Sequence, residues 1–198
     1  FLLTRAIPEE NNHRIDDFLR IASSLVEVEV DAQPRYSPRR KLEGCFADKI
    51  LLVAGTASPK TVRWKYFRQL AGRLPKDKVL FAGGPGDEEA ISQLSRGYDS
   101  LPINLSISEF ASVAQEVATV IALDSGLGHL AAAARNELNR DHRSTLIVYG
   151  STDPEKTGPR GTTPIHENRP VCWPCYAKSC RIDTPCLETS IQAVLCTM

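Results

Sequence analysis

The chain has 198 residues, with 24 Lys and Arg, 24 Asp and Glu, and 42% hydrophobic residues. Its formal net charge is zero, with both signs interleaved along the chain, so it lacks the basic surface that binds nucleic acid and no nucleic-acid partner is expected. The longest apolar runs are far shorter than the roughly 20 residues that a transmembrane helix requires. Length and composition indicate one well-packed core, or slightly more than one domain.

The first 44 residues resemble a connecting segment. Residues 15–25 have apolar side chains at helical spacing, and residues 26–30 alternate Val with Glu as in a half-exposed strand. Residues 33–44 are rich in Pro and basic side chains, which is typical of a linker or surface loop. We therefore expect a connecting segment over residues 1–44 and the main domain over residues 45–198. The chain opens on Phe1 without a signal-peptide pattern, so a piece of a longer protein is expected.

The main domain alternates buried strands with amphipathic helices. Four short apolar runs are typical of parallel strands that are covered on both faces. The predicted strands are residues 49–54, 78–82, 118–123 and 144–149. The predicted helices between them are residues 62–74, 88–95, 108–117 and 127–136. This alternation predicts a doubly wound, Rossmann-like α/β fold around a parallel sheet.

Each predicted strand is followed by a short segment that contains glycine. The four segments are GTASPK, GGPGDEE, DSGLGH and GSTDPEKTGPRG. Open α/β sheets bind ligands outside the carboxyl ends of their strands, so the four segments predict a ligand site along one edge. Turns between strands and helices also need Gly, Ser and Asp for chain geometry, which is the alternative reading for any one segment.

The DSGLGH segment predicts an anion site. Ser125 and Gly126 fall where a helix begins, so free N–H groups and the helix dipole favour a phosphate, and Gly126 and Gly128 permit close approach. Asp124 would repel a phosphate and is expected to accept hydrogen bonds from sugar hydroxyls, with His129 on the side facing the loops. The alternatives are that Asp124 caps the helix and that His129 is a buried packing residue.

Two further segments supply candidate ligand-binding residues. In GGPGDEE, Gly84 lies in the turn, and Glu88 or Glu89 could bind the vicinal hydroxyls of a ribose, although acidic residues also favour a first helical turn. In and after GTASPK, hydroxyls and cations are available for a phosphate, although such cations are often only solvated. These residues are Thr56, Ser58, Lys60 and Arg63.

These segments together resemble the carboxyl-terminal half of glycosyltransferase family 9, the heptosyltransferases of the lipopolysaccharide inner core. The resemblance covers about residues 49–195, and DSGLGHLAAA is its most diagnostic element. The other matching segments are ILLVAGTASPKTVRW, VLFAGGPGDEEAI, VYGSTDPEKTGPRG and CWPCYAKSC followed by PCLETSIQAVL. Members of the family have two Rossmann-like domains in the GT-B arrangement. The resemblance implies that this half binds the donor, ADP-heptose, and that the other half binds most of the acceptor.

The resemblance also implies roles for individual residues. The amides of Ser125 and Gly126 would bind the diphosphate, Asp124 and His129 would lie at the sugar, and Glu88 at the ribose. Where the family has a Lys two residues before its Trp, this chain has Val62, and Lys60 or Arg63 is expected to replace it. The family transfers the sugar with inversion, using a carboxylate base from the other half. No catalytic residue is therefore expected here, and the fragment alone is expected to be inactive.

The sequence contains no Asp-x-Asp motif, so we expect no metal bridge to the diphosphate and no catalytic cofactor. Four cysteines do cluster, with a spacing that permits a structural zinc or iron site, reduced thiols or disulfides. They are Cys172, Cys175, Cys180 and Cys186.

Two other classes of function remain open at this point. One is a nucleotide-sugar epimerase, and the other is a non-catalytic α/β module, stapled by a metal, that binds a nucleotide or a partner protein. For the heptosyltransferase reading the expected location is cytoplasmic, peripheral at the inner face of the inner membrane, with a lipopolysaccharide core acceptor.

Overall fold

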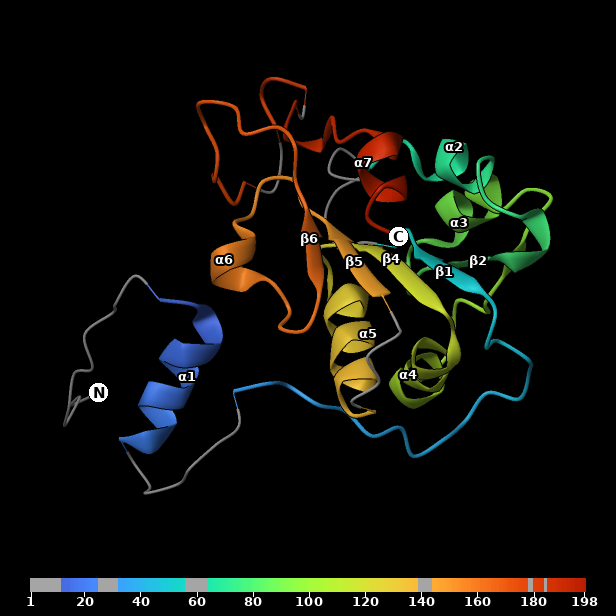
Figure 1. The fold of residues 1–198 in the computed structure, drawn as a ribbon, viewed down its shortest axis with the longest axis horizontal. Helices are drawn as coiled ribbons and strands as arrows, with labels where there is room; N and C mark the ends of the chain where they lie inside the picture. The colour runs from blue at the N-terminus through green and yellow to red at the C-terminus, as the bar shows by residue number, and fades with distance from the viewer. Residues whose placement is uncertain (1–11, 25–31, 56–63, 139–143, 178–179, 184) are drawn as a thin grey trace.

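The structure is a computed structural model that describes residues 12–24, 32–55, 64–138, 144–177, 180–183 and 185–198. Its centre is a parallel sheet of six strands in the order β3-β2-β1-β4-β5-β6 (Figure 1). In chain order the strands are β1 (Ile50–Val53), β2 (Val79–Ala82), β3 (Asp99–Ser100), β4 (Thr119–Leu123), β5 (Ser144–Val148) and β6 (Thr163–Ile165).

Seven α-helices and two short 3-10 helices are assigned among the described residues. The α-helices are α1 (Arg14–Ser23), α2 (Phe67–Ala71), α3 (Glu88–Leu94), α4 (Ile107–Glu116), α5 (Gly126–Asn136), α6 (Pro154–Thr157) and α7 (Ile191–Leu195). The 3-10 helices are η2 (Lys76–Lys78) and η3 (Pro185–Leu187). The four strands predicted from apolar runs are confirmed to within two residues at each end, as are the predicted helices that correspond to α3, α4 and α5.

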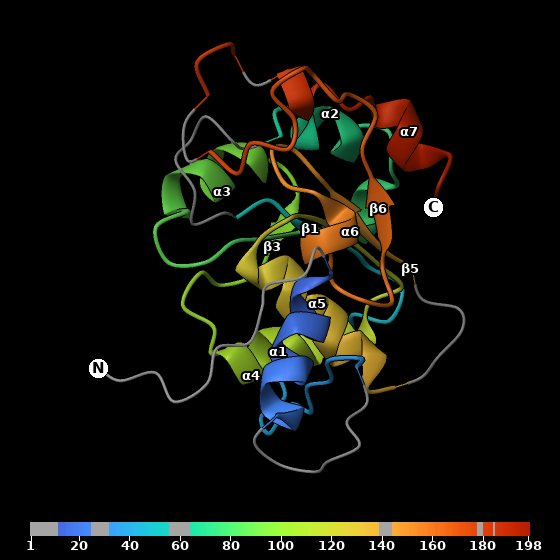
Figure 2. The ribbon, with the colours of Figure 1, turned by 90° about the vertical axis from the view of Figure 1, so that its left-hand side faces the viewer.

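Side chains of β1 alternate between two cores, one on each face of the sheet. Ile50 and Leu52 pack in a cluster with Trp64 and residues of α2, whereas Leu51 and Val53 pack with residues of α4. In Figures 1 and 2, α4 and α5 lie on one face of the sheet, and α2, α3 and α7 lie on the other. The doubly wound α/β fold predicted from the sequence is therefore confirmed.

The predicted helix over residues 62–74 is shorter in the structure. Its described part begins as a turn, and α2 is helical only over Phe67–Ala71. Trp64 lies before the helix, only 1% exposed, and its Nε1–H donates to Thr189 O at 2.9 Å. Trp64 therefore packs on the core from a non-helical position ahead of α2.

The Arg135 side chain joins two helices to two strands at the amino-terminal edge of the sheet. It lies at the end of α5 and is 7% exposed. Its guanidinium donates to the carbonyls of Ala114 and Val117 at 2.9 Å each, to Ala118 O at 3.1 Å and to Ser144 O at 3.2 Å. These carbonyls lie near the end of α4 and at the starts of β4 and β5, so one buried cation fixes where these elements meet.

Residues 33–44, predicted to be a linker or loop, form an irregular segment held against α4 and α5. Ser108 Oγ accepts from the N–H groups of Arg39 at 2.6 Å and Arg40 at 2.7 Å, and Ser112 Oγ accepts from Leu42 N–H at 3.0 Å. A hollow lies between this segment and the end of α4, at the amino-terminal edge of the sheet. Its lining residues are 41–44, Ser112, Gln115, Glu116 and Leu138.

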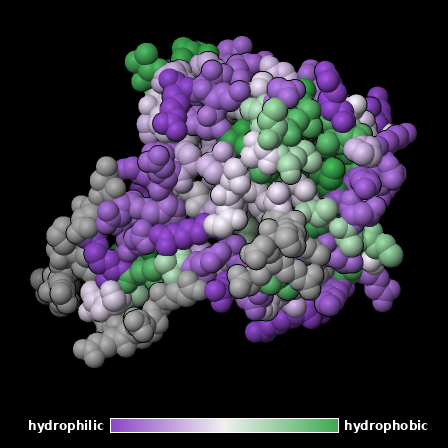
Figure 3. Space-filling view, viewed as in Figure 1, coloured by the Kyte–Doolittle hydropathy of each residue, from purple (hydrophilic) through white to green (hydrophobic). Residues whose placement is uncertain are grey.

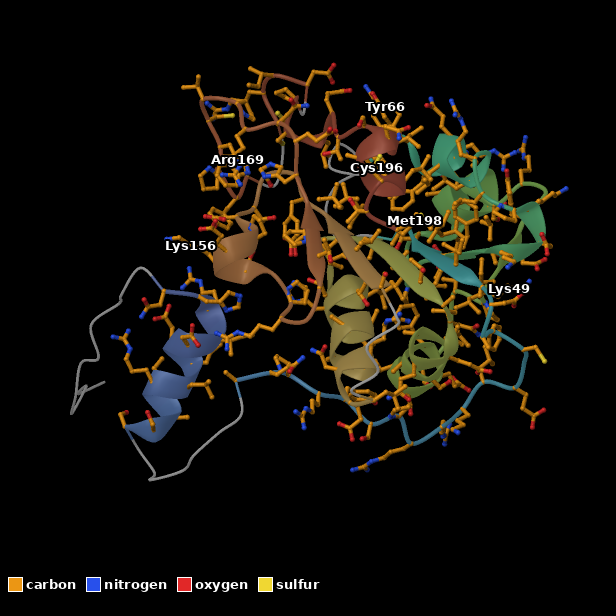
Figure 4. All side chains as sticks on the ribbon, in the orientation of Figure 1. Lys49, Tyr66, Lys156, Arg169, Cys196 and Met198 are labelled. Carbon is orange, nitrogen blue, oxygen red and sulfur yellow. The ribbon has the colours of Figure 1, made fainter. Side chains whose placement is uncertain are left out.

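The carboxyl-terminal segment is bound to the region of α2. Glu188 accepts hydrogen bonds from Lys65 Nζ at 2.5 Å and from Tyr66 Oη at 2.6 Å. Figure 4 shows Tyr66 and Cys196 close to α7, and Figure 3 shows hydrophobic side chains gathered over this part of the surface, where Ile191 of α7 packs on the core. The segment thus completes one layer of the sheet's cover.

Helix α1 lies to one side of the domain and contacts α6 through polar groups. His13 Nε2 lies 2.9 Å from Gly158 O, and Arg160 Nη2 lies 2.6 Å from Asp16 Oδ1. Phe18 is 69% exposed and Ile21 is 45% exposed, whereas Ile15 and Leu19 are half-buried, so the apolar side of the helix is covered only in part by the described residues. The strand predicted over residues 26–30 lies outside the described residues. None of the helices in the described residues has the length and apolar character to cross a bilayer.

Candidate functional site

The four strands that the glycine-containing segments follow all end at one edge of the sheet, although only Gly55 of the first segment lies within the described residues. The register pairs Val53 with Ala82 and with Ala122, and Leu123 with Val148, so the carboxyl ends of the four central strands align. The chain leaves each of these strands at the same edge (Figure 1). This is the edge at which open α/β sheets bind ligands.

Helix α5 begins at this edge with free N–H groups. Ser125 is the N-cap residue, and its Oγ accepts from Gly128 N–H at 3.3 Å. The N–H groups of Gly126 and Leu127 precede the first helical acceptor, so they have no partner within the helix. An eleven-residue helix therefore directs its positive end toward the edge, as an anion site requires.

The two glycines of this turn have different surroundings. A Cβ added to Gly126 would meet no atom within 4 Å, whereas one added to Gly128 would lie 2.5 Å from Leu123 O. Gly128 is thus explained by the tight packing of α5 on β4. Packing inside the domain does not explain Gly126, which is exposed at the start of the helix.

Asp124 is held by one residue on each carboxylate oxygen. His129 Nε2 lies 3.0 Å from Oδ1, and Thr152 Oγ1 donates to Oδ2 at 2.5 Å. We call these three residues the Asp124 cluster. The cap of α5 is Ser125 rather than Asp124, and the His129 side chain is 44% exposed, so neither alternative raised by the sequence applies. The cluster places acceptor oxygens beside the positive end of α5.

Tyr149 lies beneath the segment that carries Thr152. Its side chain is fully buried, and among the described residues no group lies within hydrogen-bond distance of its Oη. Burial, and to a lesser extent the negative charge of Asp124, holds the pKa of Tyr149 far above its usual range. The phenol therefore stays neutral at physiological pH.

The second segment is organised by Asp87. This carboxylate is 6% exposed and accepts from Gly84 N–H at 3.1 Å, which closes the turn after β2. Glu88, predicted to bind a ribose, is exposed, and its Oε1 accepts from Gly86 N–H at 3.1 Å. That bond to Gly86 is the main cause that lowers the pKa of Glu88. Glu88 is therefore ionised and accessible at the edge, on a turn that Asp87 holds in place.

Four predicted binding residues of the first segment lie outside the described residues. They are Thr56, Ser58, Lys60 and Arg63. Gly55, which precedes them, is buried, and a Cβ added there would lie 2.4 Å from Asp87 Oδ2. The first and second segments therefore leave the sheet in close contact.

The fourth segment is covered by residues that follow β6. Trp173 Nε1–H donates to Gly150 O at 3.1 Å, and the N–H groups of Cys175 and Tyr176 both donate to Ser151 O at 3.1 Å. The Arg169 guanidinium lies over the Trp173 ring, 4.6 Å from its centroid. The two residues before Thr152 are thus fixed from above by the cysteine-containing segment.

All six cysteines are free thiols, so the disulfide alternative does not apply to this structure. Within the described residues, no three potential ligands are grouped closely enough to hold a metal ion, so the predicted cysteine site does not exist in this arrangement. Cys186 is buried beside Gly150, while Cys172 and Cys175 are exposed. Burial, followed by the nearby thiols, raises the pKa of Cys186, which keeps it protonated.

Thr152 is the member of the Asp124 cluster that sequence reasoning did not select. It lies 28 residues from Asp124 and becomes its neighbour only because β4 and β5 pair in parallel. Its position in the sequence could have indicated it, since Thr152 is the third residue of the polar segment after the fourth predicted strand.

The strand order and the glycine-containing edge define a Rossmann-like nucleotide-binding class of fold. Comparison with known proteins makes the class specific: the sequence model of glycosyltransferase family 9 (heptosyltransferase) matches residues 3–190. The chain belongs to this family. It is 31% identical over 121 residues to lipopolysaccharide heptosyltransferase 1 of Pseudomonas aeruginosa, an alignment that covers 58% of this chain and 32% of the relative.

Solved structures share the fold. The family 9 glycosyltransferase of Veillonella parvula aligns with a TM-score of 0.65 at 15% identity, over 98% of this chain and 61% of that one. The Escherichia coli heptosyltransferase WaaC with ADP-2-deoxy-2-fluoro heptose aligns with a TM-score of 0.54 at 22% identity, over 79% and 44%. The chain spans about a third of the length of the curated relatives it matches, so it corresponds to part of such a protein.

Proposed function

We propose that this chain is the donor-binding part of a heptosyltransferase and that it binds ADP-heptose at the carboxyl-terminal edge of its sheet. The diphosphate would lie at the start of α5, on the N–H groups of Ser125 and Gly126. The heptose would lie at the Asp124 cluster, and the ribose near Glu88. Membership of family 9, and a heptosyltransferase of the same fold that carries an ADP-heptose analogue, support this assignment.

One observation carries the proposal: an open helix start and an anchored carboxylate lie side by side. Gly126 is exposed at the start of α5, and Asp124 immediately precedes that start, with both oxygens held by neighbours. A diphosphate needs donors and positive potential, whereas sugar hydroxyls need acceptors. A nucleotide sugar presents these two demands next to each other.

In the proposed reaction the part described here would act on the leaving group. As the bond from the sugar to the diphosphate breaks, negative charge accumulates on ADP, and the α5 dipole with its N–H groups would stabilise that charge. Such stabilisation needs no bridging metal. Deprotonation of the acceptor hydroxyl, with inversion at the sugar, is assigned to a carboxylate of the part that lies beyond this chain.

For the complete protein we also propose an acceptor substrate. A lipopolysaccharide core would bind mainly to that other part, with residues 1–44 connecting it to the donor domain over residues 45–198. On this proposal the complete enzyme works at the inner face of the inner membrane, where a lipid-linked acceptor is found.

Calorimetric titration of the 198-residue chain with ADP, UDP, GDP and CMP, and then with ADP-heptose, tests the donor site. Two variants probe the two parts of the site. Gly126→Val fills the space before the amides that would bind the diphosphate, and Asp124→Ala removes the carboxylate that would accept hydrogen bonds from the sugar hydroxyls. Asp99→Ala is the matched control, because Asp99 is an exposed carboxylate of edge strand β3.

The proposal predicts selective binding of ADP, loss of ADP binding in Gly126→Val, and weaker binding of ADP-heptose alone in Asp124→Ala. Asp99→Ala should bind as the unsubstituted chain does. Equal, weak binding of all four nucleotides, unchanged by either variant, would instead make the edge a set of structural turns and favour a non-catalytic module.

A structural metal at the cysteines remains a proposal from their spacing. Zinc or iron on Cys172, Cys175, Cys180 and Cys186 would require the sulfurs to converge from the arrangement described above. Elemental analysis of the purified chain decides the matter. One zinc or iron per chain, lost in Cys175→Ser and retained in Cys45→Ser, would support the metal, and a metal-free chain with six titratable thiols would reject it.

A further inference from the structure

Both oxygens of the Asp124 carboxylate are engaged by neighbouring side chains before any ligand binds. Thr152 donates its hydroxyl proton to Oδ2 at 2.5 Å, and His129 contacts Oδ1 at 3.0 Å. The Asp124 side chain is 15% exposed, so it is accessible only in part. A carboxylate accepts about four hydrogen bonds. One acceptor position on each oxygen is therefore left for a ligand, and the two neighbours determine where those positions point.

The position of Thr152 is determined by contacts on both sides of it. On one side, Gly150 O and Ser151 O accept from the residues above them. On the other side, Asp153 is the N-cap of α6, and its Oδ1 accepts from Glu155 N–H at 3.0 Å. A hydroxyl carried by such an anchored segment loses little conformational freedom when it bonds to Asp124. It is therefore suited to orient the carboxylate.

The direction of this hydrogen bond limits what the site can recognise. A threonine hydroxyl has one proton, and Thr152 uses it on Asp124, so its oxygen can only accept from a ligand. Asp124 likewise only accepts when it is ionised. The pair thus offers acceptors without a donor, which suits a molecule with several hydroxyl groups and disfavours a phosphate.

We propose that Thr152 is a positioning residue for the sugar end of the donor: it holds Asp124 so that the carboxylate and its own oxygen accept hydrogen bonds from adjacent sugar hydroxyls. This inference rests on the proposed donor site and adds a residue to it. It also distinguishes the two ends of the ligand, because Thr152 contributes to binding of the sugar and does not contribute to binding of ADP.

Calorimetric titration of the 198-residue chain with ADP and with ADP-heptose tests the role of Thr152. Thr152→Val keeps the shape of the side chain and removes the hydroxyl, and Thr152→Ser keeps the hydroxyl. Loss of a hydrogen bond to a charged group should weaken ADP-heptose binding about tenfold in Thr152→Val. ADP binding should stay within about twofold, and Thr152→Ser should recover most of the lost affinity.

Three results would overturn the inference. Unchanged ADP-heptose affinity in Thr152→Val, alongside a clear loss in Asp124→Ala, would leave the donor site intact and remove Thr152 from it. An equal loss for ADP and ADP-heptose would assign Thr152 a purely structural role. If the unsubstituted chain bound neither ligand, the proposed function would fail, and this inference with it. Thermal unfolding of each variant confirms that it is folded during the titration.

Discussion

Asp16 and Arg160 form an ion pair across 144 residues of sequence, with Oδ1 and Nη2 2.6 Å apart. The pair joins α1 to the segment after α6, and this is the segment that continues from Thr152. His13 strengthens the same contact through Gly158 O. Helix α1 and Asp124 therefore both contact the one continuous stretch of chain between β5 and β6.

Removing these two polar contacts should release α1 without unfolding the domain. The Asp16–Arg160 pair is partly exposed, so Asp16→Ala should lower the free energy of unfolding by only about 0.5 kcal/mol. The double variant His13→Ala, Asp16→Ala should nevertheless speed hydrogen exchange in the α1 amides, partly because His13 Nδ1 also caps the helix by accepting from Ile15 N–H at 3.1 Å, so Asp16→Ala alone isolates the effect of the ion pair. Ser23→Ala is the control, because Ser23 Oγ bonds to Arg20 O within the helix. Unchanged exchange in the double variant would mean that other contacts hold α1.

Gly126 and Gly128 should respond oppositely to alanine. Gly126→Ala adds a methyl group in open space and removes backbone freedom from the unfolded chain, so its stability should equal that of the parent or exceed it by about 0.5 kcal/mol. Gly128→Ala drives a Cβ onto Leu123 O and should cost about 2 kcal/mol. Urea unfolding measures both effects. Equal losses at the two positions would contradict the packing described for α5.

Replacing Arg135 should destabilise the domain strongly. Arg135→Met keeps much of the apolar stem but leaves buried carbonyls of α4, β4 and β5 without their donor, so a loss of about 3 kcal/mol is expected. The stability of Arg135→Lys should lie between that of the parent and that of Arg135→Met, since an ammonium cannot reach all four carbonyls. Arg73→Met, at an exposed position, should have little effect. Chemical denaturation of the three variants gives the comparison.

The capping box of α4 should make stability depend on pH. Hydrogen bonds from the Ser106 hydroxyl and the Ser106 N–H, with a smaller effect of the Arg40 charge, hold the pKa of Glu109 below its ordinary value of 4.5. The folded state therefore favours the ionised form. The stabilisation is complete above pH 4.5, the value expected in the unfolded chain, and disappears as the pH falls through the lower folded pKa.

Comparison with Glu109→Gln measures this effect. Urea unfolding should show the largest difference between parent and variant at neutral pH, and the difference should narrow below pH 4.5. In a Ser106→Ala background the pH dependence of this stability difference should be smaller, because the Ser106 hydroxyl no longer donates to Glu109 and its pKa is lowered less. A difference that stays constant from pH 7 to pH 3 would show that the ionisation of Glu109 does not contribute.

The central strands and the helix starts could be predicted from the sequence, because short stretches of neighbouring residues determine them. Continuous apolar runs located β1, β2, β4 and β5, because strands that are covered on both faces need apolar side chains at every position. Ser106 and Glu109 form the capping box that begins α4, and this pattern is visible in the sequence. The start of α5 was predicted in the same way, because it depends on the single turn at Ser125 and Gly126.

The edge strands, the role of Thr152 and the position of α1 could not be predicted, because they depend on contacts between residues far apart in the sequence. The edge strands β3 and β6 are two and three residues long, and their apolar content is too low to distinguish them from loops. Thr152 reaches Asp124 only through the pairing of β4 with β5. The position of α1 was not predicted either, because it is attached through polar groups, with Phe18 outward and Ile15 and Leu19 only half-buried.

The four carbonyls bound by Arg135 have a further consequence for how this domain could be altered. Because the guanidinium ties α4 and α5 to β4 and β5 at the amino-terminal edge, the scaffold is assembled at the edge where no ligand is expected. Foreign loops could be grafted at the opposite edge, one at a time, while the joint beneath them stays in place. The packing of α4 and α5 on β4 and β5 is thereby separated in space from the loops at the carboxyl-terminal edge.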